Sequence, residues 1–332
     1  MSTNKAGVTE RKSYTSSGVA KYFKENLGIL IAFVLICIIV SCLSPVFLTA
    51  DNAFSVLRQV STNANLALGM TLVIILGGID LSVGAVVALS GTITVGLIVN
   101  NHMNIWAAVC IGLTLGTLCG LINGVIIAYT RMAPFIVTMA VMNIARGAAY
   151  IYSNGLPIRT FDDQFAAIGT GYLGPIPLPV IYMLVSIVVI SVLLSKTRFG
   201  SHVYALGGNR EAAIFSGVPV KKVEIIVYTL SGFLSAVAGV VLAARMYSAQ
   251  PSVSQGAEMD AIAACVLGGV SMSGGLGKIG GVFIGVLIVG IISNGLNLLN
   301  VNSFWQLIVK GAIVLLAVYV DIIKKQKMLK KF

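Results

Sequence analysis

The chain has 332 residues, of which 57% are hydrophobic and 10% are charged, and its mean hydropathy is +0.97. This composition excludes an ordinary soluble globular domain and predicts an integral membrane protein. The formal net charge is +11, but the basic residues cluster at the ends of apolar runs and in the connections between them. We interpret them as topology signals, with membrane lipid and not nucleic acid as the surrounding partner.

Apolar runs long enough to cross a bilayer predict about ten transmembrane helices. We therefore expect an all-α, polytopic integral membrane protein with a transmembrane domain at 27–323, a polar tail at 1–26 and a basic tail at 324–332. The first run lacks a following cleavage site, so we interpret it as a span and not a signal peptide. The run at 261–273 is too short alone and predicts a broken or tilted helix. The expected spans are 27–43, 61–79, 81–99, 105–130, 134–153, 180–195, 223–244, 261–273, 279–299 and 303–323.

The distribution of basic residues predicts the orientation of the spans. In a ten-span topology only Arg58, Arg159 and Arg245 fall on the outer side, while Arg146 and Lys310 fall within spans. The remaining members of the 22 basic residues lie on the cytoplasmic side. The positive-inside rule therefore places both termini in the cytoplasm.

A glycine-rich motif interrupts the apolar pattern twice. Residues 76–84 read Leu-Gly-Gly-Ile-Asp-Leu-Ser-Val-Gly, and residues 267–275 read Leu-Gly-Gly-Val-Ser-Met-Ser-Gly-Gly. We interpret them as broken-helix repeats, with chance similarity as the alternative. The glycine pair lets the chain leave one helix, and Asp80 or Ser271 is expected to cap the next. The motif residues are Gly77, Gly78, Asp80, Ser82 and Gly84 in the first break, and Gly268, Gly269, Ser271, Ser273 and Gly275 in the second.

Small residues mark one face of the fourth expected span. Gly112, Gly116, Gly120 and Gly124 follow one another at intervals that place them on the same side of a helix. A bare backbone stripe of this kind predicts close packing against a neighbouring helix.

Residues 197–222 form a charged interruption between two long apolar runs. Asn209 is a good N-cap, Gly217 suits the left-handed position after a helix, and Pro219 prevents its continuation. A short helix over 210–216 is therefore expected, and its alanine pair would let another protein approach the backbone closely. An ordinary loop helix on the bilayer surface is the alternative. The residues of this predicted docking helix are Asn209, Arg210, Glu211, Ala212, Ala213, Ser216 and Gly217.

Polar residues within the spans are the candidates for a substrate pathway. A lysine near the centre of a span costs about 2.5–3.5 kcal/mol on insertion scales, so Lys310 should face the bundle interior or a wet cavity. Pairing with a carboxylate or with carbonyl groups is favoured over direct substrate contact. Asparagines in spans more often bond neighbouring helices. The possible pathway or intramembrane polar residues are Asn123, Asn143, Arg146, Asn294, Asn297, Gln306 and Lys310.

The sequence offers no catalytic, metal-binding or cofactor-binding pattern. Residues 272–279 lack both the first glycine and the final hydroxyl residue of a phosphate loop. The five cysteines lie in apolar runs without C-x-x-C spacing, and the two histidines lie in opposite loops. We therefore expect neither an enzyme nor a cofactor held by this chain.

Three motifs resemble those of the permease subunits of ribose-type monosaccharide ATP-binding-cassette (ABC) importers. The most specific is Gly-Ile-Asp-Leu-Ser-Val-Gly at 78–84. The next most specific motif lies within residues 249–269. It consists of Ala-Gln-Pro at 249–251, Glu-Met-Asp-Ala-Ile-Ala-Ala at 258–264 and Leu-Gly-Gly at 267–269. The third is Tyr-Ala-Leu-Gly-Gly-Asn-Arg-Glu-Ala-Ala at 204–213, which resembles the family's cytoplasmic coupling loop. The resemblance extends from about Phe23 to Asp321.

The resemblance implies a transport subunit that carries a monosaccharide, ribose or a related sugar, into the cytoplasm across the bacterial inner membrane. It implies a homodimer of two permease copies and a separate ATPase subunit that binds ATP and Mg²⁺ and receives the coupling helix in a groove. It also implies an extracytoplasmic sugar-binding protein. Residues 154–179 are a candidate landing surface for that protein, and a packed loop without a partner is the alternative.

Two other functions remain open from the sequence. One is a permease of the same superfamily for nucleosides or branched-chain amino acids. The other is an ion-coupled secondary transporter, which would need carboxylates within the membrane, and Asp80 is the one candidate.

Overall fold

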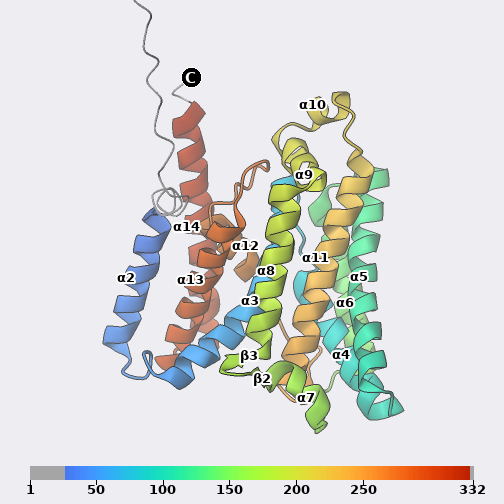
Figure 1. Ribbon diagram of the computed structural model, residues 1–332, viewed down its shortest axis with the longest axis vertical. Coiled ribbons are helices and arrows are strands. Elements are labelled where there is room, and N and C mark those ends of the chain that lie inside the picture. Colours follow the sequence, from blue (N-terminus) through green and yellow to red (C-terminus); the bar gives the residue numbers. More distant parts are fainter. Residues whose placement is uncertain (1–26, 330–332) are drawn as a thin grey trace, which may run out of the picture.

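The computed structural model describes residues 27–329 as a bundle of long helices with very little sheet (Figure 1). The predicted tail at 1–26 and the last three residues, with Lys330 and Lys331, lie outside the described residues. Within the described range, 7 helices are long and apolar enough to cross a membrane. They are α3 (Ala50–Leu76), α4 (Val83–Asn101), α5 (Ile105–Thr130), α6 (Pro134–Ser153), α8 (Leu178–Lys196), α11 (Val220–Arg245) and α13 (Ile279–Leu298).

Three further helices complete the set of expected spans. Helices α2 (Leu27–Leu43) and α14 (Ser303–Leu329) contain shorter apolar stretches, and α12 (Ala257–Leu267) has only 11 residues. The all-α, polytopic membrane class is therefore confirmed, whereas the count of ten spans stays a prediction. The half-length helix expected near 261–273 is present, although it begins earlier and ends at Leu267.

Most predicted boundaries agree with the helices, and the differences have local causes. Helix α3 begins at Ala50 and not at 61, because Thr49 caps it and its polar first turns remain helical. A hydropathy criterion does not detect such turns. Helix α14 continues through 324–329 of the predicted basic tail, since lysine is a good helix former.

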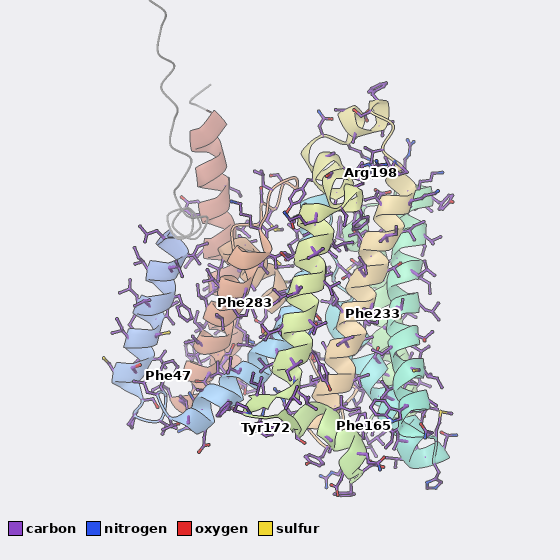
Figure 2. The ribbon with its side chains drawn as sticks, viewed as in Figure 1. Phe47, Phe165, Tyr172, Arg198, Phe233 and Phe283 are labelled. Carbon is purple, nitrogen blue, oxygen red and sulfur yellow. The ribbon has the colours of Figure 1, made fainter. Side chains whose placement is uncertain are left out.

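The connections lie at two opposite ends of the bundle (Figure 1). Helices α9 (Arg198–Gly208) and α10 (Arg210–Phe215) lie at one end, together with the first turn of α2 and the last turns of α14. Helix α7 (Asp163–Thr170) and the hairpin of β2 (Tyr172–Leu173) and β3 (Ile176–Pro177) lie at the other. Figure 2 shows the same separation, with Arg198 at the α10 end and Phe165 and Tyr172 at the α7 end.

The outer segment predicted at 154–179 is folded and packed. Asp162 caps α7 by accepting a hydrogen bond from the Phe165 N–H at 3.0 Å, and the Phe165 ring is fully buried. The short strand β1 (Ile158–Arg159) pairs antiparallel with β4 (Ser248–Ala249), with Ile158 opposite Ala249. This pairing joins the segment to the chain that follows α11.

The glycine stripe on α5 packs closely against neighbouring helices, as expected, with Gly120 and Gly124 against α11 and Gly112 against α4. A Cβ added at Gly124 would lie 2.7 Å from the Ile225 Cα, and one added at Gly120 would lie 3.0 Å from the Gly232 Cα. Gly232 faces Gly120 from α11, so neither helix has a side chain at this point of the contact. Their backbones therefore touch, which gives extensive van der Waals contact without a hydrophobic driving force.

Helix α3 runs through the centre of the bundle. Met70, Leu72 and Val73 on it are fully buried. By contrast, α6 and α8 expose large apolar side chains such as Ile144, Ile151 and Val188 on their outer faces. A helix bundle with a packed interior and an apolar outer surface suits a lipid environment.

Candidate functional site

The charged segment 197–222 contains two helices, of which the sequence predicted only the second. Helix α9 begins after Thr197, whose hydroxyl accepts a hydrogen bond from the Gly200 N–H at 3.3 Å. Asn209 then caps α10, with its Oδ1 accepting from the Ala212 N–H at 2.9 Å. Gly217 follows α10 with φ of +78°, as expected for the residue that ends the helix. The helix ends at Phe215, so Ser216 is its C-cap and not its last turn.

The orientation of α10 decides which of its two alanines is available to a partner, a choice that the sequence leaves open. Ala213 is only 4% exposed and packs in the core of its own chain, whereas Ala212 is exposed. Phe215, which no sequence motif marks as a docking residue, is 88% exposed at the end of the bundle. The free surface of α10 therefore includes Ala212, Ile214 and Phe215, and Ala213 anchors the helix.

A polar face of α11, made by Glu224, Tyr228 and Ser231, leads from α10 to the first glycine-rich break. Glu224 forms an ion pair with Arg210 of α10. The hydroxyl of Tyr228 lies beside Gly78, where an added Cβ would collide with it. Ser231 donates to Asp80 Oδ2 at 2.8 Å. Because these residues recur at intervals of three and four, they lie on one side of the helix.

The first break ends α3 with a left-handed glycine. Gly77 has φ of +95°, and the N–H groups of Gly77 and Gly78 donate to the carbonyls of Ile74 and Val73, each at 2.9 Å. These two bonds form a Schellman motif, which satisfies carbonyls at the helix end.

The expected capping role of Asp80 is wrong. The N-cap of α4 is Ser82, and Asp80 Oδ1 accepts from the Ser82 N–H at 3.0 Å and from its hydroxyl at 2.6 Å. Asp80 thus lies two residues before the cap and closes the turn that precedes the helix. Its second oxygen is bonded by Ser231, which the local sequence does not reveal.

Two more helices hold this turn in place. Asn123 of α5 donates to the Ser82 hydroxyl at 2.9 Å, and the Thr138 hydroxyl of α6 accepts from the Leu81 N–H at 3.1 Å. Gly84 lies in the first turn of α4 with its backbone against Glu258, since an added Cβ would lie 2.7 Å from Glu258 Oε2. The first break is therefore a buried, hydrogen-bonded junction of α3, α4, α5, α6 and α11.

The second break repeats this geometry with an offset of one residue. The left-handed glycine is Gly269, with φ of +83°, and the N–H groups of Gly269 and Val270 donate to Val266 and Cys265 at 2.9 Å. Ser271 Oγ accepts from the Ser273 N–H at 3.4 Å, as Asp80 accepts from Ser82. However, α13 begins only at Ile279, so Ser271 caps no helix and that expectation is also wrong.

The two breaks meet at the α10 end. The N–H of Gly275 donates to the Ile75 carbonyl at 2.8 Å, and Gly207 of α9 packs on the same two groups. The Tyr204 hydroxyl donates to the Gly277 carbonyl at 2.8 Å. Burial raises the pKa of Tyr204, which keeps this hydroxyl protonated as a donor. Helix α9 is thereby joined to both breaks.

Most of the predicted pathway residues bond neighbouring elements and do not converge. Asn294 of α13 and Asn52 of α3 exchange hydrogen bonds of 2.8 and 3.2 Å. Gln306 donates to Asn297 Oδ1 at 2.9 Å, and Asn143 is exposed on α6. These contacts agree with the expectation that polar residues in spans bond adjacent helices.

Arg146 satisfies irregular backbone between β4 and α12. Its Nη1 donates to the carbonyls of Pro251 and Val253 at 2.8 and 2.7 Å. Non-helical backbone at membrane depth is tolerated only where it is buried in protein or lines a wet cavity. Arg146 therefore has a structural role in the described residues.

Lys310 pairs with a carboxylate, as favoured from the sequence. Its Nζ lies 2.6 Å from Asp260 Oδ2, across a groove of about 420 Å³ between α12 and α14. Asp260 was missed because the predicted span began at 261, whereas α12 begins at Ala257. The groove is also lined by Gln255, Met259, Leu307, Gly311, Val314 and Leu315.

The comparison with known proteins defines the class of this molecule. Residues 52–318 match the family described as branched-chain amino acid transport system / permease component. Because this match covers most of the chain, the chain belongs to that family of transport permeases, and it is a transport subunit and not an enzyme.

Its most similar relatives include sugar permeases. The ribose import permease protein of Bacillus subtilis (strain 168) is 47% identical over 315 residues, which cover 94% of this chain and 96% of the relative. The ribose import permease protein of Escherichia coli (strain K12) is 47% identical over 296 residues, which cover 88% of this chain and 92% of the relative. The L-arabinose ABC transporter permease protein of Azospirillum brasilense is 41% identical over 294 residues, which cover 89% of this chain and 86% of the relative. No solved structure matches the chain significantly. The resemblance drawn from the sequence motifs is confirmed.

Proposed function

We propose that the chain is the membrane-spanning subunit of an ABC importer that carries a monosaccharide, ribose or a related sugar, into the cytoplasm of a bacterium. The 47% identity to a ribose import permease over 94% of the chain carries this proposal. The family description also includes amino acid transport, but the relatives described above are permeases for ribose and arabinose. The positive-inside rule favours the α10 end, with both termini, as the cytoplasmic side.

The ATPase subunit binds at α10 in this proposal and supplies ATP and Mg²⁺. A six-residue helix is not stable alone, so α10 depends on its anchors, the buried Ala213 and the ion pair of Arg210 with Glu224. These anchors leave Ala212 and the Phe215 ring free. A rigid helix with one exposed aromatic side chain suits insertion into a groove of a partner.

The contacts of α9 and α10 provide a route from the ATPase to the transport pathway. A displacement of α10 acts on Glu224 and thus on the polar face of α11, which holds Asp80 in the first break. A displacement of α9 acts on Gly275 and Ile75, where the two breaks meet. ATP binding and hydrolysis would thereby reorient the helices that surround the breaks.

The sugar-binding protein is placed at the α7 end, and a second copy of the chain completes the pathway. The outer segment offers exposed apolar side chains there, among them Phe161, Leu156 and Leu173. A folded segment with such side chains suits a transient protein contact.

Uptake of labelled ribose into proteoliposomes tests the proposal. The vesicles contain the chain with its ATPase subunit, and the binding protein is added on the side opposite ATP. We expect uptake that requires ATP, survives a protonophore, and is inhibited by unlabelled ribose but not by leucine or a nucleoside. Uptake that follows an imposed ion gradient without ATP would instead support a secondary transporter. Inhibition of ribose uptake by leucine or a nucleoside would show that the substrate belongs to another chemical class.

A further inference from the structure

We propose that the groove between α12 and α14 is part of the sugar path, and that Asp260 and Lys310 hydrogen-bond to the hydroxyl groups of the passing sugar. This inference rests on the proposed sugar import and assigns residues to it. It follows from the ion pair in the groove, from the non-helical backbone beside it, and from the size and lining of the groove.

The ion pair is open to the groove. The side chains of Asp260 and Lys310 are 14% and 29% exposed, and both line the groove. The ion pair of Arg210 with Glu224, by contrast, lies at the α10 end and not between two spans. Charged atoms that faced lipid would lose hydration without a replacement. The groove therefore contains water or polar ligand when the protein is in a membrane.

The backbone beside the pair supports the same conclusion independently. Residues 250–256 are not helical, and Gln255 and Gly256 from this segment line the groove. Gly256 has φ of +81°, a conformation that places the chain outside any regular helix. Irregular backbone that is not sealed within protein needs a water-filled cavity at membrane depth.

The chemistry of the lining suits a small polyhydroxylated ligand. A carboxylate has several acceptor sites and an ammonium three donors, so one ion pair leaves capacity of both kinds for hydroxyl groups. Leu307, Val314 and Met259 offer apolar surface to the C–H faces of a sugar ring. A volume of about 420 Å³ lies within the range of about 300–1,000 Å³ for small-molecule sites. An open groove with few polar groups favours brief binding, as passage requires.

Cysteine labelling in the assembled complex tests whether the groove is wet. Leu307 and Leu315 line the groove, whereas their neighbours Ile308 and Leu316 are also exposed but do not line it. Each of the four is replaced by cysteine in a parent without native cysteines, and the rate of modification by a charged thiol reagent is measured. We expect labelling about tenfold faster or more at Leu307→Cys and Leu315→Cys, and slower labelling there when ribose is added.

Each other outcome contradicts the proposal. Equal labelling rates at the groove and neighbour positions would show that the groove faces lipid. Labelling rates in the groove that ribose does not change would show that the sugar does not bind there. Cross-linking of two copies through Leu315→Cys without aqueous labelling would identify a subunit contact. Ribose uptake by the unaltered chain and by the cysteine-free parent separates the two hypotheses. If both import ribose, these results contradict only the groove assignment, and if the unaltered chain imports none, the proposed function fails first.

Kinetics of the charged pair distinguish sugar contact from helix packing. We expect Asp260→Asn and Lys310→Gln each to raise the KM for ribose uptake about tenfold at an unchanged level in the membrane. The exchange Asp260→Lys with Lys310→Asp keeps an ion pair but moves donors and acceptors. Normal KM in the exchanged variant would mean that the pair only joins α12 to α14, and would overturn the inference.

Discussion

Arg210 of α10 and Glu224 of α11 form an ion pair in which the two partners have very different access to water. The side chain of Glu224 is 4% exposed and that of Arg210 is 46% exposed. The second carboxylate oxygen of Glu224 has no hydrogen-bond partner within the described residues. Removal of the guanidinium would therefore leave a buried carboxylate without its basic partner. Movement of α10 away from α11 therefore costs the free energy of leaving the Glu224 carboxylate buried and unpaired.

Arg210→Met should weaken the junction of α10 and α11. We expect a loss of about 1–2 kcal/mol in the free energy of unfolding, below the value for a fully buried pair because Arg210 reaches solvent. Glu224→Gln should be milder, and the double variant should recover much of the loss, since no buried charge remains. Thermal melting in detergent measures this. Lys222→Met removes an exposed basic residue from the same segment, and an equal effect of that control would contradict the argument.

Asp80→Ala should destabilise the first break more than Asp80→Asn. Alanine leaves the Ser82 N–H and the hydroxyls of Ser82 and Ser231 without their acceptor, at about 1–3 kcal/mol for each unsatisfied buried group. Asparagine keeps one oxygen acceptor for Ser82, and its amide can donate to Ser231. Melting temperature and ribose uptake are the measurements, with Asp163→Ala, an exposed carboxylate in the first turn of α7, as the control. Complete loss of uptake in a well-folded Asp80→Asn variant would show that the negative charge itself is needed.

Gly120→Ala and Gly147→Ala should have opposite effects. A Cβ at Gly120 collides with the backbone of α11, so the helices must separate, at about 1–3 kcal/mol. Gly147 of α6 has nothing within 4 Å of an added Cβ, and alanine there should stabilise the helix by about 0.5–1 kcal/mol. Thermal melting of both purified variants measures the difference. Equal tolerance of the two substitutions would disprove the backbone contact between α5 and α11.

Phe215→Ala should weaken binding of the ATPase without affecting the stability of the chain, because the ring is 88% exposed. An aromatic anchor at the centre of an interface contributes about 2 kcal/mol or more, so affinity should fall at least about thirtyfold. Phe161, 85% exposed at the α7 end, is the matched control. Co-purification with the ATPase should be normal for Phe161→Ala, while contact with the binding protein should weaken. Reduced ATPase binding in both variants would mean that the loss is not local to α10.

Ala212→Arg and Ala213→Arg separate the two sides of α10. Ala212→Arg should leave expression and melting unchanged while it blocks the ATPase, because the new side chain extends from the free surface. Ala213→Arg should destabilise the isolated chain, since it places a charge in a site that is 4% exposed. Melting curves with and without the ATPase distinguish these effects. Normal melting of Ala213→Arg would contradict the observed packing of α10.

Much of this molecule was determined by the sequence alone, because bilayer thickness and backbone hydrogen bonding act locally. Apolar run length predicted the helices at 27–43, 105–130 and 134–153. The turn chemistry at Asn209 and Gly217 also acts within a few residues, so the cap and the end of α10 were predictable. The same holds for the left-handed glycine in each break.

The tertiary structure decided which residues meet and which face of each helix is free. The local sequence predicts Asp80 as a cap because its neighbours allow it, but Ser231, which donates a hydrogen bond to it, lies 151 residues away. Asp260 and Lys310 are separated by 50 residues, and their pairing depends on how α12 packs against α14. The rotation of α10 was equally undetermined, since Ala212 and Ala213 are alike in sequence and only packing buries one of them. Helices that are apolar on all sides carry no periodic signal of their orientation, so close packing between distant segments alone selects it.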